Sequence, residues 1–460
     1  MDIQGHKVLV LGGYGLVGMA VCRELLLREP AEIQIHSLRR EESEEARRAL
    51  ASEAGATRLT VSWGDIFGLH EEAPRRQRIH AQLTTLHDDK LGAFLLYRLL
   101  DESRPEIVID CVNTATGIAY RDMFQAAEAL FVQLEKTEGP SPDAAEDLLQ
   151  SLYIPRLIRH IQVLYRGMVD AGPRVYFKVG TSGTGGMGLN VPYTHSEEKP
   201  SRVLLSKSAV AGAHSMLLFL MARTPGAPIT KEIKPAAAIA WKKIGHGPIV
   251  RGGEHLRLVA ATPRPVGETF STLDPTAGEL TNEVLETAYI DTGENGIFSL
   301  EEFAMLTTAA QMEFVTPEEI ARILVFEIEG GNTGHDIINA LDNAVLGPTY
   351  RAGLMRHWAL ERLGELESQG DTRSVAFEML GPPRNTKLLY ETHLLREAFG
   401  TMTAVRESTP AEVAEKLDRL LQEQPRLASE ALAVGLPILL RSGELLRGPS
   451  VIVPADTHQA

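Results

Sequence analysis

The chain has 460 residues, of which 44% are hydrophobic and 23% are charged, so it has the composition of a globular protein long enough for two domains. Its formal net charge of -15 argues against a general affinity for nucleic acid or for an anionic membrane. The two cysteines, Cys22 and Cys111, provide no disulfide framework, and we expect both to be small buried side chains.

The first apolar run begins at Lys7 with no secretory leader before it, and the sequence therefore predicts a cytoplasmic protein. The most apolar helical run, Met216 to Ala222, is too short to cross a bilayer, so we expect no association with a membrane.

The amino-terminal segment predicts a strand, a glycine-rich turn and a helix. Lys7 to Leu11 is a short apolar run typical of a buried parallel strand, and Leu16 to Arg28 has helical spacing that ends before Pro30. Glycines in such a turn let the backbone approach a dinucleotide pyrophosphate, and the helix N-terminus directs N–H groups at the phosphates. An ordinary strand–helix turn is the alternative. The residues predicted to bind the cofactor here are Gly12, Gly13, Tyr14, Gly15, Leu16, Val17 and Gly18.

Two arginines lie at the end of the second predicted strand, Glu32 to Arg40. An acidic residue at this place would bind the ribose 2′-hydroxyl of NAD, whereas this chain has Ser37, Arg39 and Arg40 there. Because a guanidinium suits a 2′-phosphate, the sequence favours NADP over NAD as the cofactor. In the alternative interpretation, the arginines only begin a solvated, charge-rich segment.

Short motifs follow the next predicted strands. The third strand, Leu59 to Trp63, leads to a motif that we place against the adenine, with a plain turn as the alternative. The fourth, Glu106 to Val112, and the fifth, Arg174 to Val179, lead to small polar residues at the edge where ligands bind in open α/β sheets. Strands that alternate so regularly with helices predict a doubly wound parallel sheet. The cofactor-binding residues predicted after the third and fourth strands are Asp65, Ile66, Asn113, Thr114 and Ala115.

The order of these motifs resembles the extended short-chain dehydrogenase/reductase family, which includes nucleotide-sugar epimerases and dehydratases. The resemblance covers roughly the first half of the chain. It rests on the spacing of Gly12, Gly15 and Gly18, on the motifs after strands three to five, and on the segment Ser196 to Ala209. It implies a Rossmann-type α/β fold and an NADP or NAD cofactor, and it leaves a homodimer open.

In this family, a serine or threonine near the fifth strand polarises the substrate carbonyl, a tyrosine transfers the proton, and a lysine one helical turn later holds the nicotinamide ribose. Lys207 matches the lysine, and Thr181 or Ser182 matches the hydroxyl. Val203 occupies the tyrosine position and cannot transfer a proton, so the expected donor is Tyr193, a residue of the second half, or water. The alternatives are a solvated helix lysine and ordinary turn hydroxyls.

Beyond Pro225 the alternation of strand and helix weakens. We therefore predict a dinucleotide-binding domain over residues 1–225 and a larger, mainly helical substrate-cap region over 226–460. The helices expected in the second region span 317–329, 335–345, 350–367, 386–398 and 410–421.

Asp291 to Glu302 nearly fits a calcium EF-hand loop, but Gly293 removes a ligand, and a polar turn is the better interpretation. The segments Glu329 to Asp336 and Arg384 to Lys387 are interpreted as a helix-entry loop and a solvated basic loop, with an anion site or hinge as the alternative for the first. No catalytic metal is predicted, because metal-ligand spacing is missing among His335, His357 and His393.

Together these features predict an NAD(P)-dependent oxidoreductase or epimerase-like enzyme that acts on a carbonyl or hydroxyl group of a small molecule with a non-standard proton donor. Because Val203 replaces the tyrosine, the alternative is a catalytically inactive NADP-binding sensor or assembly protein. A helical scaffold with a vestigial nucleotide-binding domain is a third option.

Overall fold

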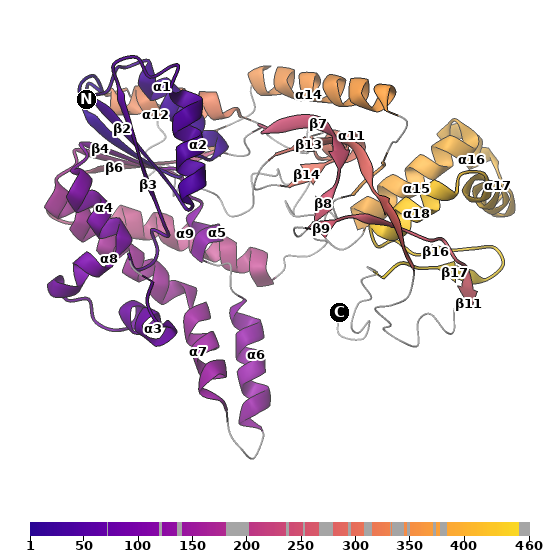
Figure 1. Cartoon of the computed structure of the whole chain (residues 1–460), viewed down its shortest axis with the longest axis horizontal. Helices are drawn as coiled ribbons and strands as arrows, with labels where there is room; N and C mark the ends of the chain where they lie inside the picture. Colours follow the sequence, from indigo (N-terminus) through magenta and orange to yellow (C-terminus); the bar gives the residue numbers. More distant parts are fainter. Residues whose placement is uncertain are drawn as a thin grey trace. The chain divides into compact units, whose positions relative to one another are not determined.

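A computed structural model describes most of the chain, in two compact units. Unit 1 draws its described residues from 1–194, 200–240 and 312–353, and unit 2 draws its described residues from 241–311 and 354–460. Figure 1 follows the chain by colour from the amino to the carboxyl terminus. The described residues are 1–70, 72–118, 122–135, 140–180, 202–235, 239–251, 254–265, 279–292, 296–307, 315–331, 333, 345–346, 350–370, 374–377 and 384–449.

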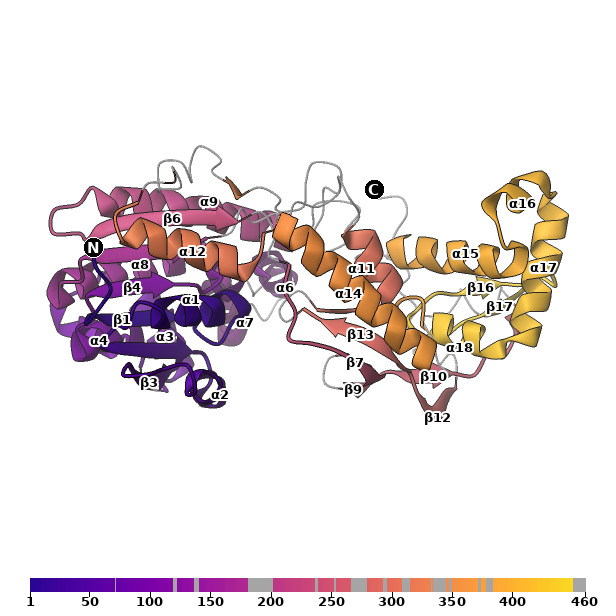
Figure 2. The same ribbon diagram turned by 90° about the horizontal axis from the view of Figure 1, so that it is seen from above.

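A parallel sheet is the centre of unit 1, and its seven described strands lie in the order β15-β6-β5-β4-β1-β2-β3. Figure 2 shows β6, β4, β1 and β3 crossing the unit in this sequence. The strands are Lys7–Leu11 (β1), Glu32–Ser37 (β2), Arg58–Trp63 (β3), Ile107–Asp110 (β4), Val175–Val179 (β5), Ile229–Pro235 (β6) and Val345–Leu346 (β15).

Helices cover both faces of this sheet, because successive strand residues point to opposite sides and both sides are apolar. Phe177 of β5 packs with α1, α2 and α12, whereas Tyr176 packs with α4, α8 and α9. This arrangement confirms the predicted doubly wound α/β fold. The helices are Leu16–Leu26 (α1), Arg40–Leu50 (α2), Pro317–Ile328 (α12), Leu95–Ser103 (α4), Thr114–Ile118 (α5), Tyr153–Ala171 (α8) and Arg202–Ala222 (α9), and a 3-10 helix, η1, spans Asp88–Ala93.

Unit 1 continues past the boundary predicted at residue 225, since β6, α12 and β15 belong to it. β6 is hard to recognise in the sequence because charged side chains interrupt its apolar residues. α12 begins at a capping box of Thr316 and Glu319 and packs along α1. The amino-terminal nitrogen of Met1 donates a hydrogen bond to the Ile328 carbonyl at 2.8 Å, so the start of the chain is held against the end of α12.

α9 is longer than the apolar run singled out in the sequence. Its segment Leu205–Ala222 has a mean hydropathy of 1.3 and satisfies the length and composition of a membrane span, with 33% of the segment buried. In unit 1 this helix packs against α8, α5 and β6 and covers one face of the sheet, which accounts for much of its apolar character.

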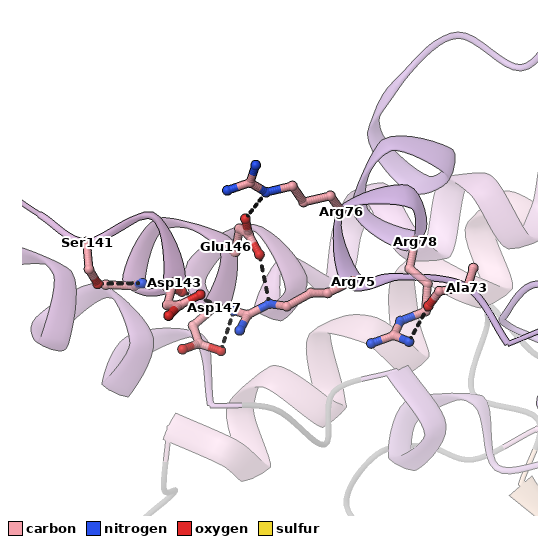
Figure 3. Close-up of polar contacts among 9 residues, drawn as sticks. Ala73, Arg75, Arg76, Arg78, Ser141, Asp143, Glu146 and Asp147 are labelled. Carbon is pink, nitrogen blue, oxygen red and sulfur yellow. Dashed lines mark hydrogen bonds and ion pairs between the residues drawn. The ribbon is translucent and has the colours of Figure 1, made fainter.

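Two helices, Met123–Leu134 (α6) and Pro142–Ser151 (α7), pack together as an arm that projects from unit 1 (Figure 1). α7 is fastened to Arg75–Leu83 (α3) by two arginines. Arg75 Nη2 lies 2.7 Å from an Asp147 oxygen, and Arg76 Nε lies 2.5 Å from a Glu146 oxygen (Figure 3).

Unit 2 joins short antiparallel strands to helices around a separate apolar core that includes Phe377 and Leu432. Helices over the predicted ranges 350–367, 386–398 and 410–421 are confirmed. Of the predicted helix 335–345, residues 335–344 lie outside the described residues, and Val345 belongs to strand β15 instead. Its strands are Lys243–Pro248 (β7), Val250–Arg251 (β8), Glu254–His255 (β9), Arg257–Val259 (β10), Arg264–Pro265 (β11), Leu280–Val284 (β12), Glu286–Asp291 (β13), Ile297–Phe298 (β14), Ile438–Leu439 (β16) and Glu444–Leu446 (β17). Its helices are Leu300–Leu306 (α11), Arg384–Phe399 (α15), Met402–Glu407 (α16), Pro410–Glu423 (α17) and Pro425–Ala433 (α18), and Tyr350–Gln369 (α14) begins within unit 1.

The EF-hand-like segment has the structure of a turn between strands. β13 ends at Asp291 and pairs antiparallel with β14, and the Thr292 amide donates to the Gly296 carbonyl at 2.9 Å. Glu302 belongs to the capping box of α11 with Ser299. Among the residues described in unit 2, these contacts fit the polar-turn interpretation, and Gly293 lies outside them. The basic segment that begins at Arg384 forms the start of α15 instead of a loop.

Candidate cofactor and catalytic site

The turn between β1 and α1 lies where the strand order reverses, since β2 lies on one side of β1 and β4 on the other. Gly12 has a positive φ of +75°, and a Cβ atom there would lie 3.1 Å from the Cys111 carbonyl carbon. A Cβ atom on Gly18 would lie 2.2 Å from the Gly12 oxygen, and one on Gly13 would lie 2.6 Å from an Ile35 methyl group. The backbone therefore requires glycine at these positions.

The same turn presents the start of α1 at the carboxyl edge of the sheet. The Gly15 amide donates to the Gly12 carbonyl at 3.1 Å, and Gly15 then caps α1 without any side-chain hydrogen bond. The first helical residues, Leu16 and Val17, follow directly. A glycine-lined turn with an uncapped helix N-terminus can receive the phosphates of a dinucleotide.

Tyr14 connects this turn to the second strand. Its backbone N–H donates to the Ser37 hydroxyl at 3.2 Å, and its own hydroxyl donates to Glu45 at 3.2 Å. Burial and the neighbouring Glu45 carboxylate raise the pKa of the Tyr14 phenol. These contacts hold the end of β2 beside the glycine turn.

Arg39 and Arg40 lie at the junction of β2 and α2. The Arg39 guanidinium pairs with Glu42 at 2.6 Å while its side chain stays 71% exposed. The Arg40 guanidinium lies 4.9 Å from the centre of the Trp63 ring. A 2′-phosphate bound by Arg39 would therefore compete with Glu42 for the same guanidinium.

Asp65 and Ile66 form the turn after β3. One Asp65 oxygen accepts a hydrogen bond from the Phe67 amide at 2.9 Å, and the other lies 3.1 Å from Arg156. Ile66 is buried in the core beneath. The Asp65 carboxylate thus already has two partners within unit 1, and its contact with an adenine stays a prediction.

The motif after β4 is packed against α9. Thr114 begins α5, which contacts α9, and both Thr114 and Ala115 are buried. The Asn113 carbonyl accepts a hydrogen bond from the Gly117 amide at 2.9 Å. The Thr114 hydroxyl is buried without a protein partner, which leaves it free to contact a ligand at this edge.

Lys207 lies on α9, half-buried, one turn before Ala211 and two turns before His214. Because residues at this spacing share one face of a helix, Lys207 lies on the side that covers the sheet. Val203 is helical and stands one turn earlier, which is the position of the missing tyrosine. Thr181, Ser182 and Tyr193 lie outside the described residues.

A cluster of buried charged and polar side chains lies directly under this edge, and none of its residues is predicted from the sequence. Lys178 and Asp110 are each 1% exposed and form an ion pair at 2.9 Å. Lys178 also donates to the Val112 carbonyl at 2.6 Å, and the Tyr176 hydroxyl donates to Asp110 at 2.8 Å. Burial, and then the Asp110 charge, raise the pKa of Tyr176 well above its usual range.

Three further ionisable residues belong to this cluster: His160 on α8, His214 on α9 and Glu232 on β6. Burial lowers the pKa of His160 to about 4 and lowers the pKa of His214 well below its usual range. Burial also raises the pKa of Glu232, against the opposing effects of Lys234, Ser215 and Lys178. Both histidines are therefore neutral, and the carboxyl group holds its proton more strongly than usual.

One signal of this cluster is present in the sequence. A parallel strand covered on both faces is normally apolar throughout, yet Asp110 and Lys178 interrupt two such strands near their carboxyl ends, and Glu232 interrupts a third at its middle. Because Asp110 and Lys178 have opposite charges and lie near the ends of two predicted buried strands, they indicate a buried ion pair.

The turn from Gly12 to Gly18 has the geometry that a dinucleotide needs. Its glycines leave no room for a Cβ atom, and the Thr114 hydroxyl is unpartnered at the same edge. Where residues are described, no cluster of three or more histidine, cysteine, aspartate or glutamate side chains could hold a metal ion.

Comparison with known proteins matches residues 258–460 to the family described as the Beta-methylindole-3-pyruvate reductase C-terminal domain. A comparison with curated sequences gave no match. The match lies in the second half of the chain, so it is independent of the glycine turn. It supports an oxidoreductase and agrees with the resemblance predicted from the first half.

Solved structures similar to the chain include a short-chain type dehydrogenase/reductase from Mycobacterium ulcerans, 14% identical with a TM-score of 0.37, over 80% of this chain and 100% of that one. Pen from Bacillus thuringiensis is 8% identical with a TM-score of 0.35, over 72% and 70%. L-Sorbose reductase from Gluconobacter frateurii, complexed with NADPH and L-sorbose, is 12% identical with a TM-score of 0.30, over 51% and 71%. Since these TM-scores are low, the fold assignment rests on this chain's own strand order.

Proposed function

We propose that the protein is an NADP-dependent reductase of a small carbonyl compound. The observation that carries the proposal is the glycine turn, with α1 starting from it at the point where the strand order reverses. The match of the second half to a reductase domain favours reduction over epimerisation. That family's name contains a pyruvate, so the substrate class we propose is a 2-oxo acid with an aromatic side chain.

In this mechanism the residues of the chain bind and orient the reactants. The turn from Gly12 to Gly18 receives the pyrophosphate, Arg39 receives the 2′-phosphate, and Lys207 holds the nicotinamide ribose. The nicotinamide, when bound, supplies a hydride to the substrate carbonyl. The proton that completes the alcohol comes from a group other than the tyrosine, because Val203 stands in its place.

The test is a fluorescence titration of the purified protein with NADPH and NADH, followed by absorbance assays of NADPH oxidation with 2-oxo acids such as indole-3-pyruvate. We expect tighter binding of NADPH and turnover of aromatic 2-oxo acids. Absence of binding to both cofactors would overturn the proposal.

A separate variant, Arg39→Ala, tests the preference for NADPH over NADH. We expect Arg39→Ala to weaken NADPH binding about tenfold, the loss of one charge-assisted contact, and to leave NADH binding unchanged. Arg47→Ala is the matched control, because Arg47 lies on the same helix and pairs with Glu44 at 2.7 Å. Equal loss of both cofactors in Arg39→Ala would contradict the assignment of the 2′-phosphate.

A second candidate function is a cofactor-binding protein without turnover, which the position of Val203 on α9 favours. It predicts tight NADPH binding and no oxidation of NADPH with any carbonyl compound. Turnover of one 2-oxo acid decides against it.

A further inference from the structure

The buried cluster beneath the carboxyl edge of unit 1 contains polar atoms that no protein group satisfies. They are both ring nitrogens of His160, Nε2 of His214 and Oε2 of Glu232. His160 and His214 are each 3% exposed, and Glu232 is 1% exposed. The Ile66 backbone interacts with the His160 ring, and Ser215 lies within reach of the Glu232 carboxyl, but these atoms have no well-formed hydrogen bond.

These three residues come from three different elements, and the buried Lys178 acts electrostatically on each of them. The His160 and His214 ring centres are 6.0 Å apart. The other charged groups that act on them are Asp110, on His160 and Glu232; Lys234, on His214 and Glu232; and Arg156, on His160. All three residues therefore lie within electrostatic reach of the same buried cation, Lys178.

An unsatisfied buried polar group costs about 1–3 kcal/mol, so several in one place require a physical reason. Water is the ligand that fits, because a buried water needs two to four polar partners and can both donate and accept. The side chains present are also able to exchange protons: a carboxyl group whose pKa is raised by burial and two neutral imidazoles.

The cluster lies close behind the expected position of the reaction. A Cβ atom on Gly180 would lie 2.2 Å from Oε1 of Glu232, so the carboxyl group is in contact with the backbone at the end of β5. Ser215 and His214 lie on the same helix as Lys207, with His214 two turns further along. Lys178 and Asp110 fix the backbone at Val112, just before Asn113.

We propose that His160, His214 and Glu232 line a buried water-binding site that supplies the proton for carbonyl reduction in place of the missing tyrosine. The inference rests on the proposed function. As the carbonyl carbon gains hydride, its C=O π electrons move to oxygen, and this alkoxide takes a proton from the Glu232 carboxyl through bound water. Glu232 is then a carboxylate, which water from the solvent reprotonates through the histidines. These residues act through water and are relay residues, not residues that contact the substrate.

The test compares Glu232→Gln with the wild-type protein. We expect kcat at neutral pH to fall at least 100-fold, with KM and NADPH affinity changed less than threefold, because glutamine fills the same space without an acidic proton. The wild-type kcat should fall as pH rises through the pKa of Glu232, and the variant should lose this dependence. Glu327→Gln is the matched control, since Glu327 is buried and lies on α12 at the opposite face.

A folded Glu232→Gln variant with wild-type kcat and pH profile would overturn the relay. Absence of NADPH binding by the wild-type protein would instead overturn the proposed function, so the two failures are distinguishable. A second measurement requires no turnover. The sample is the cofactor-free Glu430→Gln protein, because burial raises the pKa of Glu430 to about 7 and its carboxyl band would overlap that of Glu232. At a pH just above 4.5, the ordinary pKa of glutamate, its infrared spectrum should contain the carbonyl stretch of a protonated carboxylic acid, shifted in D₂O. If this band is absent, the relay is overturned even where Glu232→Gln fails to fold.

Discussion

Unit 1 buries His36, His160 and His214, whose pKa values lie below the usual range, whereas unit 2 buries a carboxyl group, Glu430, whose pKa is raised to about 7. Desolvation is the largest cause in each case, and it opposes the charged form. The same physical effect therefore gives the buried histidines of unit 1 and the buried carboxyl group of unit 2 opposite responses to pH, while Glu232 in unit 1 responds as Glu430 does.

The sign follows from the unfolded chain. Each of these histidines binds a proton more readily when unfolded, so the stability that they contribute to unit 1 is fully present above about pH 6.5 and is lost as pH falls toward about 4. Glu430 releases its proton more readily when unfolded. The stability that Glu430 contributes to unit 2 is therefore fully present below about pH 4.5 and is lost as pH rises through about 7. We expect acid to weaken unit 1 through its buried histidines, and base to weaken unit 2 through Glu430.

The largest effect we expect tests whether the cofactor depends on unit 1 alone. Gly18→Ala places a Cβ atom 2.2 Å from the Gly12 oxygen, so the turn must move, and NADPH affinity should fall at least 100-fold by calorimetry. The unfolding transition of unit 2 should not change. The control is Gly92→Ala, where a Cβ atom would meet nothing within 4 Å. Retained binding in Gly18→Ala would show that the turn is not the cofactor site.

The next effect concerns the ion pair under the edge. Lys178→Met leaves Asp110 buried without its cation, so we expect unit 1 to lose about 3–5 kcal/mol of unfolding free energy, measured with urea. Lys90→Met is the control, because the Lys90–Asp89 pair is 70% exposed on both sides and is worth about 1 kcal/mol or less. An equally small loss in both variants would contradict a buried charge pair in unit 1.

The pH response of unit 2 is the third comparison. We expect Glu430→Gln to remove the loss of stability that Glu430 causes between about pH 4.5 and 7 in that unit, on the order of 3 kcal/mol at most. Urea unfolding at a series of pH values measures it. Glu415→Gln, at a position 55% exposed, should retain the wild-type pH dependence. If Glu430→Gln behaves like wild type, the two units do not differ in this way.

The smallest effect concerns the arm of unit 1. Arg75→Ala removes the contacts to Asp147 and Glu146 and should cost about 1 kcal/mol, while limited proteolysis between α6 and α7 becomes faster. Arg78→Ala is the control, since Arg78 donates only to the nearby Ala73 carbonyl, at 2.7 Å (Figure 3). Equal cleavage rates in the two variants would show that Arg75 does not fasten α7.

The sequence was sufficient to predict the parts of the fold that depend on local pattern. The glycine turn is required by backbone contacts at Gly12 and Gly18, and each of the first five predicted strands is present. What it missed depends on contacts between distant residues. Asp110 and Lys178 are far apart in the chain and become partners only when β4 and β5 pair. β6 was missed because its charged residues are not typical of a buried strand. They are accommodated only by contacts with distant elements, such as the ion pair of Lys231 with Glu327 on α12.

The packing of α12 on α1 has a consequence for protein synthesis. The face of α1 that α12 covers stays uncovered until residues 317–328 have left the ribosome. At ~5–20 residues per second, roughly 15–60 s pass between translation of the first helix and of its partner. During this time the nascent chain exposes an apolar surface of the kind that chaperones bind. The helix that follows the glycine turn then still lacks its packing against α12.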